Sequence, residues 1–255
     1  MRDSGLDEAI RAAGGVGALA RKIGIAQPSV SNWTRIPAER VIAIEAATAV
    51  DRAILRPDLF GSAGDADDID AARAQEYALL ATLMRRAPDA ELLQRLAGLR
   101  GDDSVIGTAH AALAAAAGRV TAEAAEREFF DLFTGVGRGE FLPYGSYYLT
   151  GFLYERPLAR LREQLAELGI ARARDDNEPE DHVAFLLEIM AGLASRRLAA
   201  YAGAERALFE QHVAPWVGRL FNDVAGAEHA AFYRHVGALG RVFIDIETEA
   251  FALPS

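Results

Sequence analysis

Residues 178–182 carry the side chains best suited to bind a cation: they read Glu-Pro-Glu-Asp-His and precede an apolar segment with helical spacing. A proline and several acids near a first turn predict a helix start there, with Asn177 or Glu178 as its cap. At about 100° per residue, one face of this helix carries an acidic and aromatic set with His182 at its edge. That set is Glu178, Asp181, Phe185 and Glu188. We therefore expect an acidic patch that faces away from the core and suits a cationic partner.

The same helix, predicted over residues 179–199, has a second face that is apolar. Its members follow the helical period and are Val183, Leu186, Leu187, Met190 and Leu193. This pattern is typical of a helix buried on one side. The core face is thus expected to hold the acidic face in place.

An aromatic segment lies upstream of the acidic patch. A predicted helix over 121–134 ends in Phe129, Phe130 and Phe133, and a glycine-rich loop over 135–139 follows it. Pro143, Tyr144, Tyr147 and Tyr148 come next, on what we expect to be an irregular turn. Tyrosines offer flat apolar area with a polar tip, as peptide sites do. The phenylalanines suit a peptide groove or an ordinary core equally well.

Together these segments resemble the TorD/DmsD/NarJ family of cytoplasmic chaperones that mature molybdenum-containing respiratory enzymes. The resemblance is carried by residues 178–182 with Glu188, by Leu-Phe-Thr-Gly at 132–135, and by Pro-Tyr-Gly-Ser-Tyr-Tyr at 143–148. A looser ending at 212–216 and 232–233 agrees with it, so the resemblance covers about residues 72–250. Phe129 departs from the family pattern, in which a tryptophan is frequent, so the indole N–H donor is lost.

The resemblance implies a signal-peptide-binding chaperone without catalytic activity. Its client is an apo-molybdoenzyme of the formate dehydrogenase or DMSO-reductase type, held by its twin-arginine leader or N-terminal region until the molybdenum cofactor is inserted. Paired arginines require carboxylates beside an apolar trough. The implied peptide-binding residues are Phe129, Leu132, Phe133, Pro143, Tyr144, Ser146, Tyr147, Glu178, Asp181 and His182. Helix capping by Glu178 and Asp181, and a scaffold role for His182, remain alternatives.

Other chemistry at these residues is disfavoured. Glu178, Asp181 and His182 could ligate a metal, but the remaining histidines show no ligand spacing around them. Ser146 with His182 and Asp181 cannot form a hydrolase triad on a helix, because adjacent side chains diverge by about 100°. A phosphate or nucleotide on the loop over 135–139 rests on glycines alone. We expect no enzyme activity, no cofactor and no metal.

Residues 1–60 have a different pattern. Predicted helices over 6–13, 16–23, 27–35 and 38–50, with a glycine-containing turn before the third, are typical of a DNA-reading helix-turn-helix. Val30 and Trp33 face inward. The outward set comprises Gln27, Ser29, Asn32 and Arg35 for base edges, with Arg21 and Lys22 for phosphates. This unit resembles YdaS/Cro-type regulators; a helical packing module that never touches DNA is the alternative.

The remaining sequence predicts an all-α chain of two domains. A small, acidic stretch at 61–70 is expected to be a flexible linker. The domain after it, 71–255, has further predicted helices over 70–86, 88–99, 104–117, 155–169, 204–223 and 227–250. We expect a TorD-like helical bundle.

Composition limits the function further. The 255 residues are 51% apolar and contain no cysteine, which excludes disulfides and cysteine-ligated zinc or iron–sulfur clusters. No signal peptide or membrane span is evident, so we expect a cytoplasmic protein. Lys22 is the only lysine and follows no P-loop.

The formal net charge of −10 is uneven, because residues 1–60 carry +1 and the residues beyond Phe60 carry −11. The near-neutral helix-turn-helix would therefore need base contacts and a homodimer to bind duplex DNA well. The protein is expected to be a chaperone that also regulates transcription according to client binding. The alternative is a transcription regulator that uses the TorD-like domain as a sensor or dimerisation unit.

Overall fold

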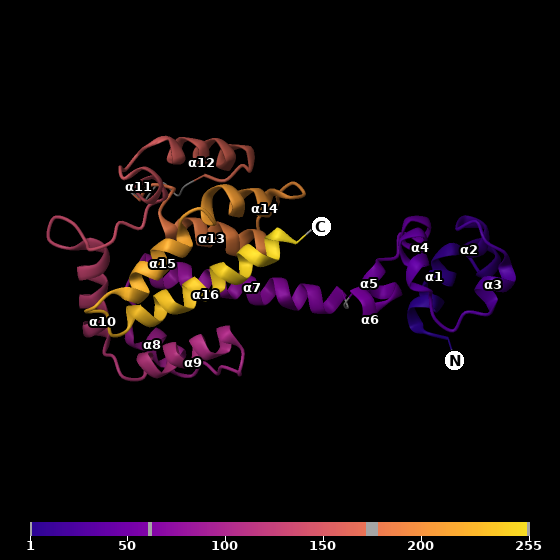
Figure 1. Cartoon of the computed structure of the whole chain (residues 1–255), viewed down its shortest axis with the longest axis horizontal. Coiled ribbons are helices and arrows are strands. Elements are labelled where there is room, and N and C mark those ends of the chain that lie inside the picture. Colours follow the sequence, from indigo (N-terminus) through magenta and orange to yellow (C-terminus); the bar gives the residue numbers. More distant parts are fainter. Residues whose placement is uncertain (1, 61–62, 172–177, 254–255) are drawn as a thin grey trace. The chain divides into compact units, whose positions relative to one another are not determined.

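The computed structural model describes residues 2–60, 63–171 and 178–253, and side chains within these ranges except 63–66 (Figure 1). In these ranges the regular structure is helical, and the extended pairing is one isolated antiparallel bridge between Tyr144 and His182. The all-α prediction is confirmed. The chain divides into a smaller unit, Met1–Ala71, and a larger unit, Ala72–Ser255. No helix among the described residues is long and apolar enough to cross a membrane.

The smaller unit is a cluster of short helices. They are α1 (Ser4–Ala13), α2 (Val16–Lys22), α3 (Gln27–Ser31), the 3₁₀ turn η1 (Ala38–Arg40), α4 (Val41–Thr48), α5 (Arg52–Leu55) and α6 (Pro57–Phe60). The Asp3 carboxylate caps α1 by accepting from the Gly5 N–H. Gly14 and Gly15, with φ of 87° and 116°, let the chain leave α1 and enter α2. The core of the unit is fully buried and comprises Leu6, Leu19, Val30, Ile36, Val41, Ile44 and Leu55.

The third helix is shorter than its sequence pattern predicts. We expected it to reach Arg35, but α3 ends at Ser31. The chain turns so that the half-buried Trp33 packs on the core beside the buried Val30, as the inward pattern requires. Arg35 consequently lies outside the helix, and its position relative to α3 differs from the expected one.

The acidic stretch after Phe60 is also different from the prediction. Gly61 and Ser62 lie outside the described residues, and α7 (Ala63–Arg85) begins directly after them. A flexible linker over 61–70 is therefore wrong from Ala63 onward. Alanines favour helix, so this composition suits a helix start.

The larger unit contains the remaining helices. They are the part of α7 from Ala72 onward, α8 (Ala90–Ala97), α9 (Val105–Ala117), α10 (Ala122–Phe129), the π-helical turn η2 (Phe130–Thr134), α11 (Gly145–Thr150), α12 (Arg156–Glu167), α13 (Val183–Ala194), α14 (Ala204–Leu208), the π-helical turn η3 (Phe209–Val213), α15 (Val217–Gly226) and α16 (Tyr233–Ala252). Asp89, Ser104 and Thr121 cap α8, α9 and α10 through their side chains. These capped starts lie within two residues of the predicted ones.

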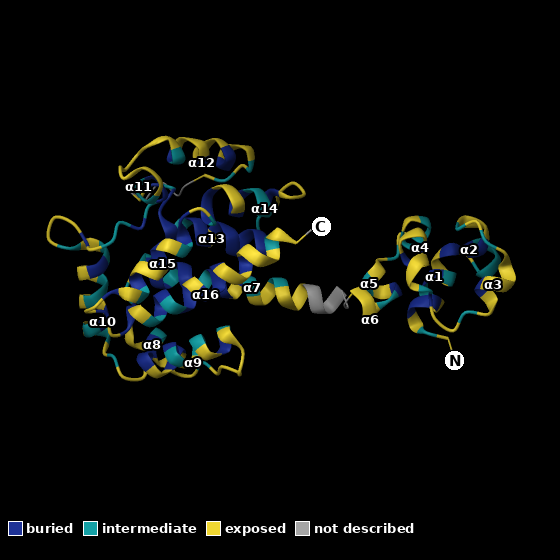
Figure 2. Cartoon of the chain, viewed as in Figure 1, coloured by how far each residue is buried: buried dark blue, intermediate teal, exposed yellow. Residues whose placement is uncertain are grey.

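Helix α13 is the centre of this unit. Ten of its twelve residues are buried, and Figure 2 shows it as a mostly dark-blue helix. Val183, Leu187 and Met190 are fully buried in one core cluster with residues of α7, α15 and α16. The predicted core face of α13 is confirmed.

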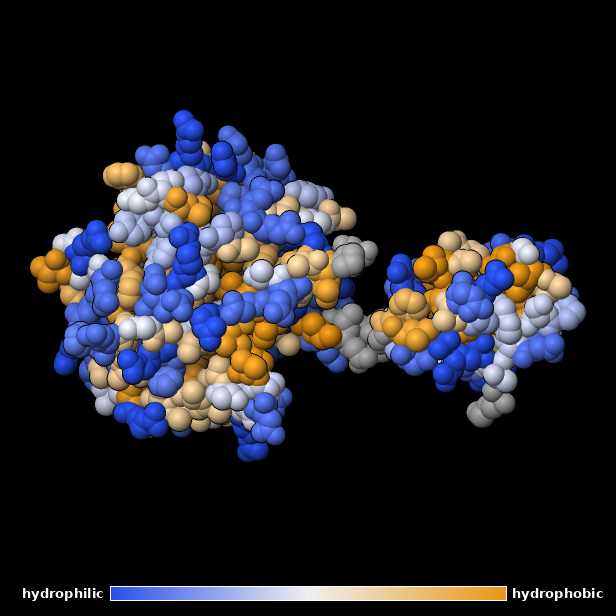
Figure 3. All heavy atoms as spheres, viewed as in Figure 1, coloured by the Kyte–Doolittle hydropathy of each residue, from blue (hydrophilic) through white to orange (hydrophobic). Residues whose placement is uncertain are grey.

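Figure 3 shows that large apolar side chains also reach the surface among hydrophilic ones.

Several boundaries in the larger unit depart from the periodic pattern, among them both ends of the helix predicted over 179–199, which is α13 (Val183–Ala194). The predicted helix over 204–223 is interrupted by η3 and a turn, and the last helix starts at Tyr233 rather than 227. Residues 145–150, expected to be irregular, form α11. A periodic apolar pattern continues through a π-helical turn, so it does not reveal such interruptions.

Candidate functional site

The backbone joins the tyrosine segment to the acidic segment. Besides the Tyr144–His182 bridge, the Gly145 N–H donates to the Asp181 carbonyl at 2.9 Å. The Val183 N–H donates to the Pro143 carbonyl, also at 2.9 Å. These bonds hold the first residues of α11 and α13 together, although 35 residues separate Ser146 from Asp181. Pro143, Tyr144, Ser146, Asp181 and His182 are thus brought together.

Asp181 lies inside the protein. Its side chain is 2% exposed, and its Oδ2 accepts from the Ser146 N–H at 2.7 Å. Ser146 is 1% exposed. Asp181 Oδ1 and Ser146 Oγ are buried without a hydrogen-bond partner in the described part of the chain. The expectation that Asp181 faces solvent is wrong, because the helix begins only at Val183 and the 100° spacing does not apply before it.

His182 has the scaffold role that we kept as an alternative. It is the N-cap of α13, and its Nδ1 accepts from the Ala184 N–H at 3.1 Å. Its ring meets the Tyr144 ring edge to face, with 5.1 Å between centroids. The predicted cap at Glu178 is wrong, and Asn177 lies outside the described residues.

Glu178 presents the exposed carboxylate of the joined segments. It accepts from the Tyr144 hydroxyl. Burial raises the pKa of Tyr144, and the hydrogen bond to Glu178 and its charge raise it further, so the phenol remains a donor. The other members of the expected acidic face do not lie together with Glu178. Phe185 packs against the core, and Glu188 pairs with Arg85 at 3.1 Å.

The expected apolar trough is largely core. Leu132 is 3% exposed, and the half-buried Phe129 and Phe133 pack on each other and on Tyr233, with centroid separations of 5.2 to 5.8 Å. Tyr147 is also half-buried, and the Arg138 guanidinium lies over its ring at 5.6 Å. The phenylalanines therefore surround Tyr233 and do not join Asp181 and His182.

Sequence reasoning missed an exposed apolar turn after α11. Within residues 149–154, Phe152 and Tyr154 are 70% and 71% exposed, and Leu149 and Leu153 are also exposed. Tyr154 has φ of 62°, a conformation uncommon for a bulky residue. Tyr144 is the N-cap of α11, and the apolar turn follows at the other end of the same helix. An apolar run interrupted by Gly151 was the pattern that could have identified it.

Phe133→Ala is expected to destabilise the larger unit by about 2 to 3 kcal/mol. A fully buried phenylalanine costs about 3 to 5 kcal/mol on truncation, and Phe133 is half-buried. Urea unfolding should show the loss, and client affinity should survive at permissive temperature. Phe130→Ala is the control, because Phe130 is 42% exposed on the same turn. If both variants lowered the free energy of unfolding by the same small amount, Phe133 would be a surface residue and not a core residue.

The geometry does not favour the other kinds of site considered from sequence, which are a metal site, a hydrolase triad and a phosphate-binding loop. The described residues contain no group of three His, Cys, Asp or Glu placed to hold a metal ion. Ser146 Oγ has no hydrogen-bond partner there, so it forms no relay with His182. In the loop over 135–139, the Gly135 N–H bonds back to the Phe130 carbonyl instead of pointing at a ligand.

The candidate DNA-binding residues of the smaller unit divide into two groups. Arg21, Lys22, Gln27, Ser29 and Asn32 are exposed on or beside α2 and α3. The Lys22 ammonium donates to the Ala47 carbonyl at 3.2 Å. Arg35 differs from these residues, because its guanidinium forms ion pairs with Asp3 and Asp58 of the same unit.

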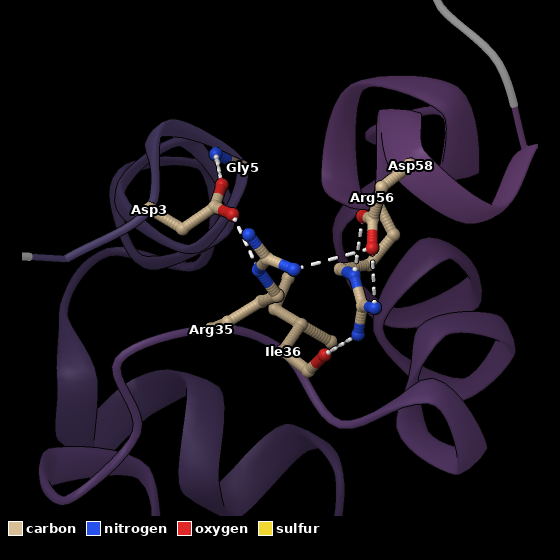
Figure 4. Close-up of polar contacts among 6 residues, drawn as sticks. All are labelled: Asp3, Gly5, Arg35, Ile36, Arg56 and Asp58. Carbon is tan, nitrogen blue, oxygen red and sulfur yellow. Dashed lines mark hydrogen bonds and ion pairs between the residues drawn. The ribbon is translucent and has the colours of Figure 1, made fainter.

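Figure 4 shows how Arg35 is held. Its Nε and Nη1 pair with Asp3 at 3.0 Å and Asp58 at 3.2 Å. Arg56 also binds Asp58, at 2.7 Å, and donates to the Ile36 carbonyl. The hydrogen bond from Arg56 lowers the pKa of Asp58 to about 2, so this network is ionised at neutral pH. The Arg35 side chain thus ties the start of α1 to α6 while it stays exposed, and base reading by Arg35 remains a prediction.

Comparison with known proteins agrees with both resemblances. Residues 100–222 match the family described as nitrate reductase delta subunit, and residues 6–64 match the family described as bacterial toxin YdaS. The chaperone protein TorD of Aliivibrio fischeri is 31% identical over 107 residues, 38% of this chain and 49% of that protein. TorD of Vibrio cholerae is 34% identical over 99 residues (35% and 45%), and TorD of Vibrio atlanticus is 26% identical over 135 residues (49% and 63%). The chain spans about half the length of the curated relatives it matches.

Proposed function

From the similarity of the larger unit to TorD-type chaperones, we propose that this protein is a cytoplasmic chaperone that matures a molybdoenzyme by stoichiometric binding. The client is an apo-enzyme of the formate dehydrogenase or DMSO-reductase type. The chaperone holds its twin-arginine leader or N-terminal region until the molybdenum cofactor is inserted. The observation that carries the proposal is the exposed Glu178 carboxylate, which accepts from Tyr144 at the start of α11, the helix that leads into the apolar turn over 149–154.

The chemistry of this surface suits such a leader. A guanidinium forms its strongest hydrogen bonds with carboxylates, and the apolar stretch behind an arginine pair needs exposed apolar area. Glu178 supplies the first, and Phe152 and Tyr154 supply the second. Asp181 and His182 act from below as positioning residues, because they fix the starts of α11 and α13.

Glu178→Gln is expected to weaken binding of a twin-arginine leader peptide about fivefold, as loss of an exposed charge pair does. Calorimetry with wild type and variant measures this, and a matched twin-lysine peptide should bind less tightly to the wild type. Glu188→Gln is the control, since Glu188 is exposed but pairs with Arg85.

Equal affinity of wild type and Glu178→Gln would remove Glu178 from the peptide site. Asp181→Ala does not serve this purpose. That change deletes the acceptor of the buried Ser146 N–H, so folding and binding would fall together.

A second role is favoured by the exposed polar set on the smaller unit. We propose that Arg21, Lys22, Gln27, Ser29 and Asn32 bind duplex DNA, and that a homodimer places two units on two half-sites. The protein would then regulate transcription according to whether a client is bound to the larger unit. The competing form of this proposal is a transcription regulator whose larger unit serves as a sensor or dimerisation unit.

For DNA, Asn32→Ala is expected to cost about 1 to 3 kcal/mol at one base-pair position, whereas Lys22→Ala should weaken all sequences alike and flatten the salt dependence. The measurement is selection of genomic DNA by the full-length protein at a stated salt concentration. Arg35→Ala should instead lower thermal stability, because it breaks the pairs with Asp3 and Asp58. If no sequence is enriched, the unit is a packing or docking module.

A further inference from the structure

A cavity of about 450 Å³ opens between α7, α8 and α9, on elements other than those of the joined α11 and α13 segments. Figure 1 shows α8 and α9 as neighbouring helices of the larger unit. The cavity is lined by Glu76 and Leu79 of α7, by Leu92, Arg95 and Leu96 of α8, by Leu99 and Arg100 after it, and by His110 of α9, with Ala72 and Gln75 at the side. Its volume is that of a small-molecule site.

Glu76 lines this cavity and has one carboxylate oxygen without a hydrogen-bond partner among the described residues. The residue is 8% exposed, and its Oε2 lies 2.9 Å from His110 Nε2. Its Oε1 is buried and has no hydrogen-bond partner among the described residues. A buried carboxylate oxygen without a donor is unfavourable, so a group that donates to Oε1 would be stabilised there.

His110 occupies one oxygen of the Glu76 carboxylate. The hydrogen bond to Glu76 raises the pKa of His110, which outweighs the effect of burial. Because His110 Nε2 lies at Oε2, Oε1 is left to accept from another donor, such as a hydroxyl or a ring N–H.

The walls and the mouth of the cavity have separate chemistry. Leu79, Leu92, Leu96 and Leu99 line it with apolar area. Arg95 and Arg100 are exposed at its edge, and neither has an ion-pair partner in the described parts of the chain. In a chain of net charge −10, these two guanidinium groups make this edge of the cavity locally cationic.

We propose that this cavity binds a small organic acid with an apolar body, which donates a hydroxyl or N–H to Glu76 Oε1 and places its acidic group on Arg95 and Arg100. The apolar body lies against the four leucines. The site uses none of the residues of the α11 and α13 segments.

The probe is 4-hydroxyphenylacetate, which carries a phenol donor, an apolar ring and a carboxylate. Two analogues each lack one feature: phenylacetate has no donor, and 4-methylphenol has no acid. Titration of the full-length protein by NMR is expected to show saturable binding of 4-hydroxyphenylacetate, with shifts at Glu76, Leu79 and His110. Each analogue should bind about tenfold more weakly.

The variant Arg95→Gln/Arg100→Gln should weaken the probe about tenfold and leave 4-methylphenol unchanged, because only the acid contacts these arginines. Both side chains are exposed, so folding is preserved. Arg127→Gln, at an exposed arginine of α10 outside the cavity, should bind the probe as the wild type does. Equal affinities for the three compounds, shifts elsewhere, or no saturable binding would overturn the proposal.

Discussion

Glu247→Ala is expected to lower the free energy of unfolding of the larger unit by about 3 to 5 kcal/mol, the range for breaking a buried ion pair on one side. Glu247 is 1% exposed on α16. It accepts from Arg73 Nε at 2.8 Å and Nη2 at 2.7 Å, and from the Tyr77 hydroxyl at 2.7 Å. Truncation leaves the largely buried Arg73 guanidinium and a buried phenol without this acceptor.

The measurement is urea unfolding of the full-length protein, followed by a signal of the larger unit. Asp245→Ala is the matched control on the same helix, because Asp245 forms an exposed pair with Arg241 at 3.2 Å and should matter little. The double change Arg73→Leu/Glu247→Leu should destabilise less than Glu247→Ala, since the guanidinium is removed with its acceptor and is not left with Glu205 as its remaining partner. A loss for Glu247→Ala as small as that for Asp245→Ala would contradict a buried network.

Gly237→Ala is expected to destabilise the same unit by about 3 kcal/mol, at the upper end of what overpacking costs. Helices α15 and α16 approach closely at this glycine. A methyl group there would lie 2.4 Å from the Ala225 nitrogen and 2.7 Å from the Phe221 carbonyl oxygen. Both atoms are backbone, so the helices must separate to admit it.

Gly218→Ala makes the same chemical change on α15 with the opposite expected sign. Its added methyl group would meet the nearest atom, Ile244 Cγ2, at 3.6 Å, which is an ordinary contact. Alanine should then stabilise by about 0.5 kcal/mol through helix propensity. Thermal unfolding of both variants measures the difference, and two similar melting temperatures would mean that the α15–α16 interface yields easily.

The helical architecture was predictable because apolar spacing and caps are local. The starts of α8, α9 and α10 follow from Asp89, Ser104 and Thr121, whose side chains satisfy free N–H groups within three residues. The inward positions of Val30 and Met190 follow from the helical period alone. Two domain resemblances were also readable, since motif order is a property of the chain.

The start of α13 was not predictable by the same reasoning. Residues 178–182 have the composition of a first helical turn, yet they form a bend and a turn, in which the His182 N–H donates to the Pro179 carbonyl and His182 pairs with Tyr144. That pairing satisfies backbone groups of a distant segment, and local propensity contains no information about it. Asp181 changed from an expected surface acid to a buried acceptor for this reason.

The sequence by itself determined the helical class, the helix-turn-helix and TorD-like resemblances, the core face of α13 and the residue types of the candidate site. These depend on periodicity and on motifs along the chain. Only the tertiary structure decided which of those residues reach solvent: Glu178 does, Asp181 and His182 do not, and Arg35 is tied to Asp3 and Asp58. The physical reason is that burial and ion pairing depend on partners 23 to 35 residues away in the chain, which no local pattern specifies.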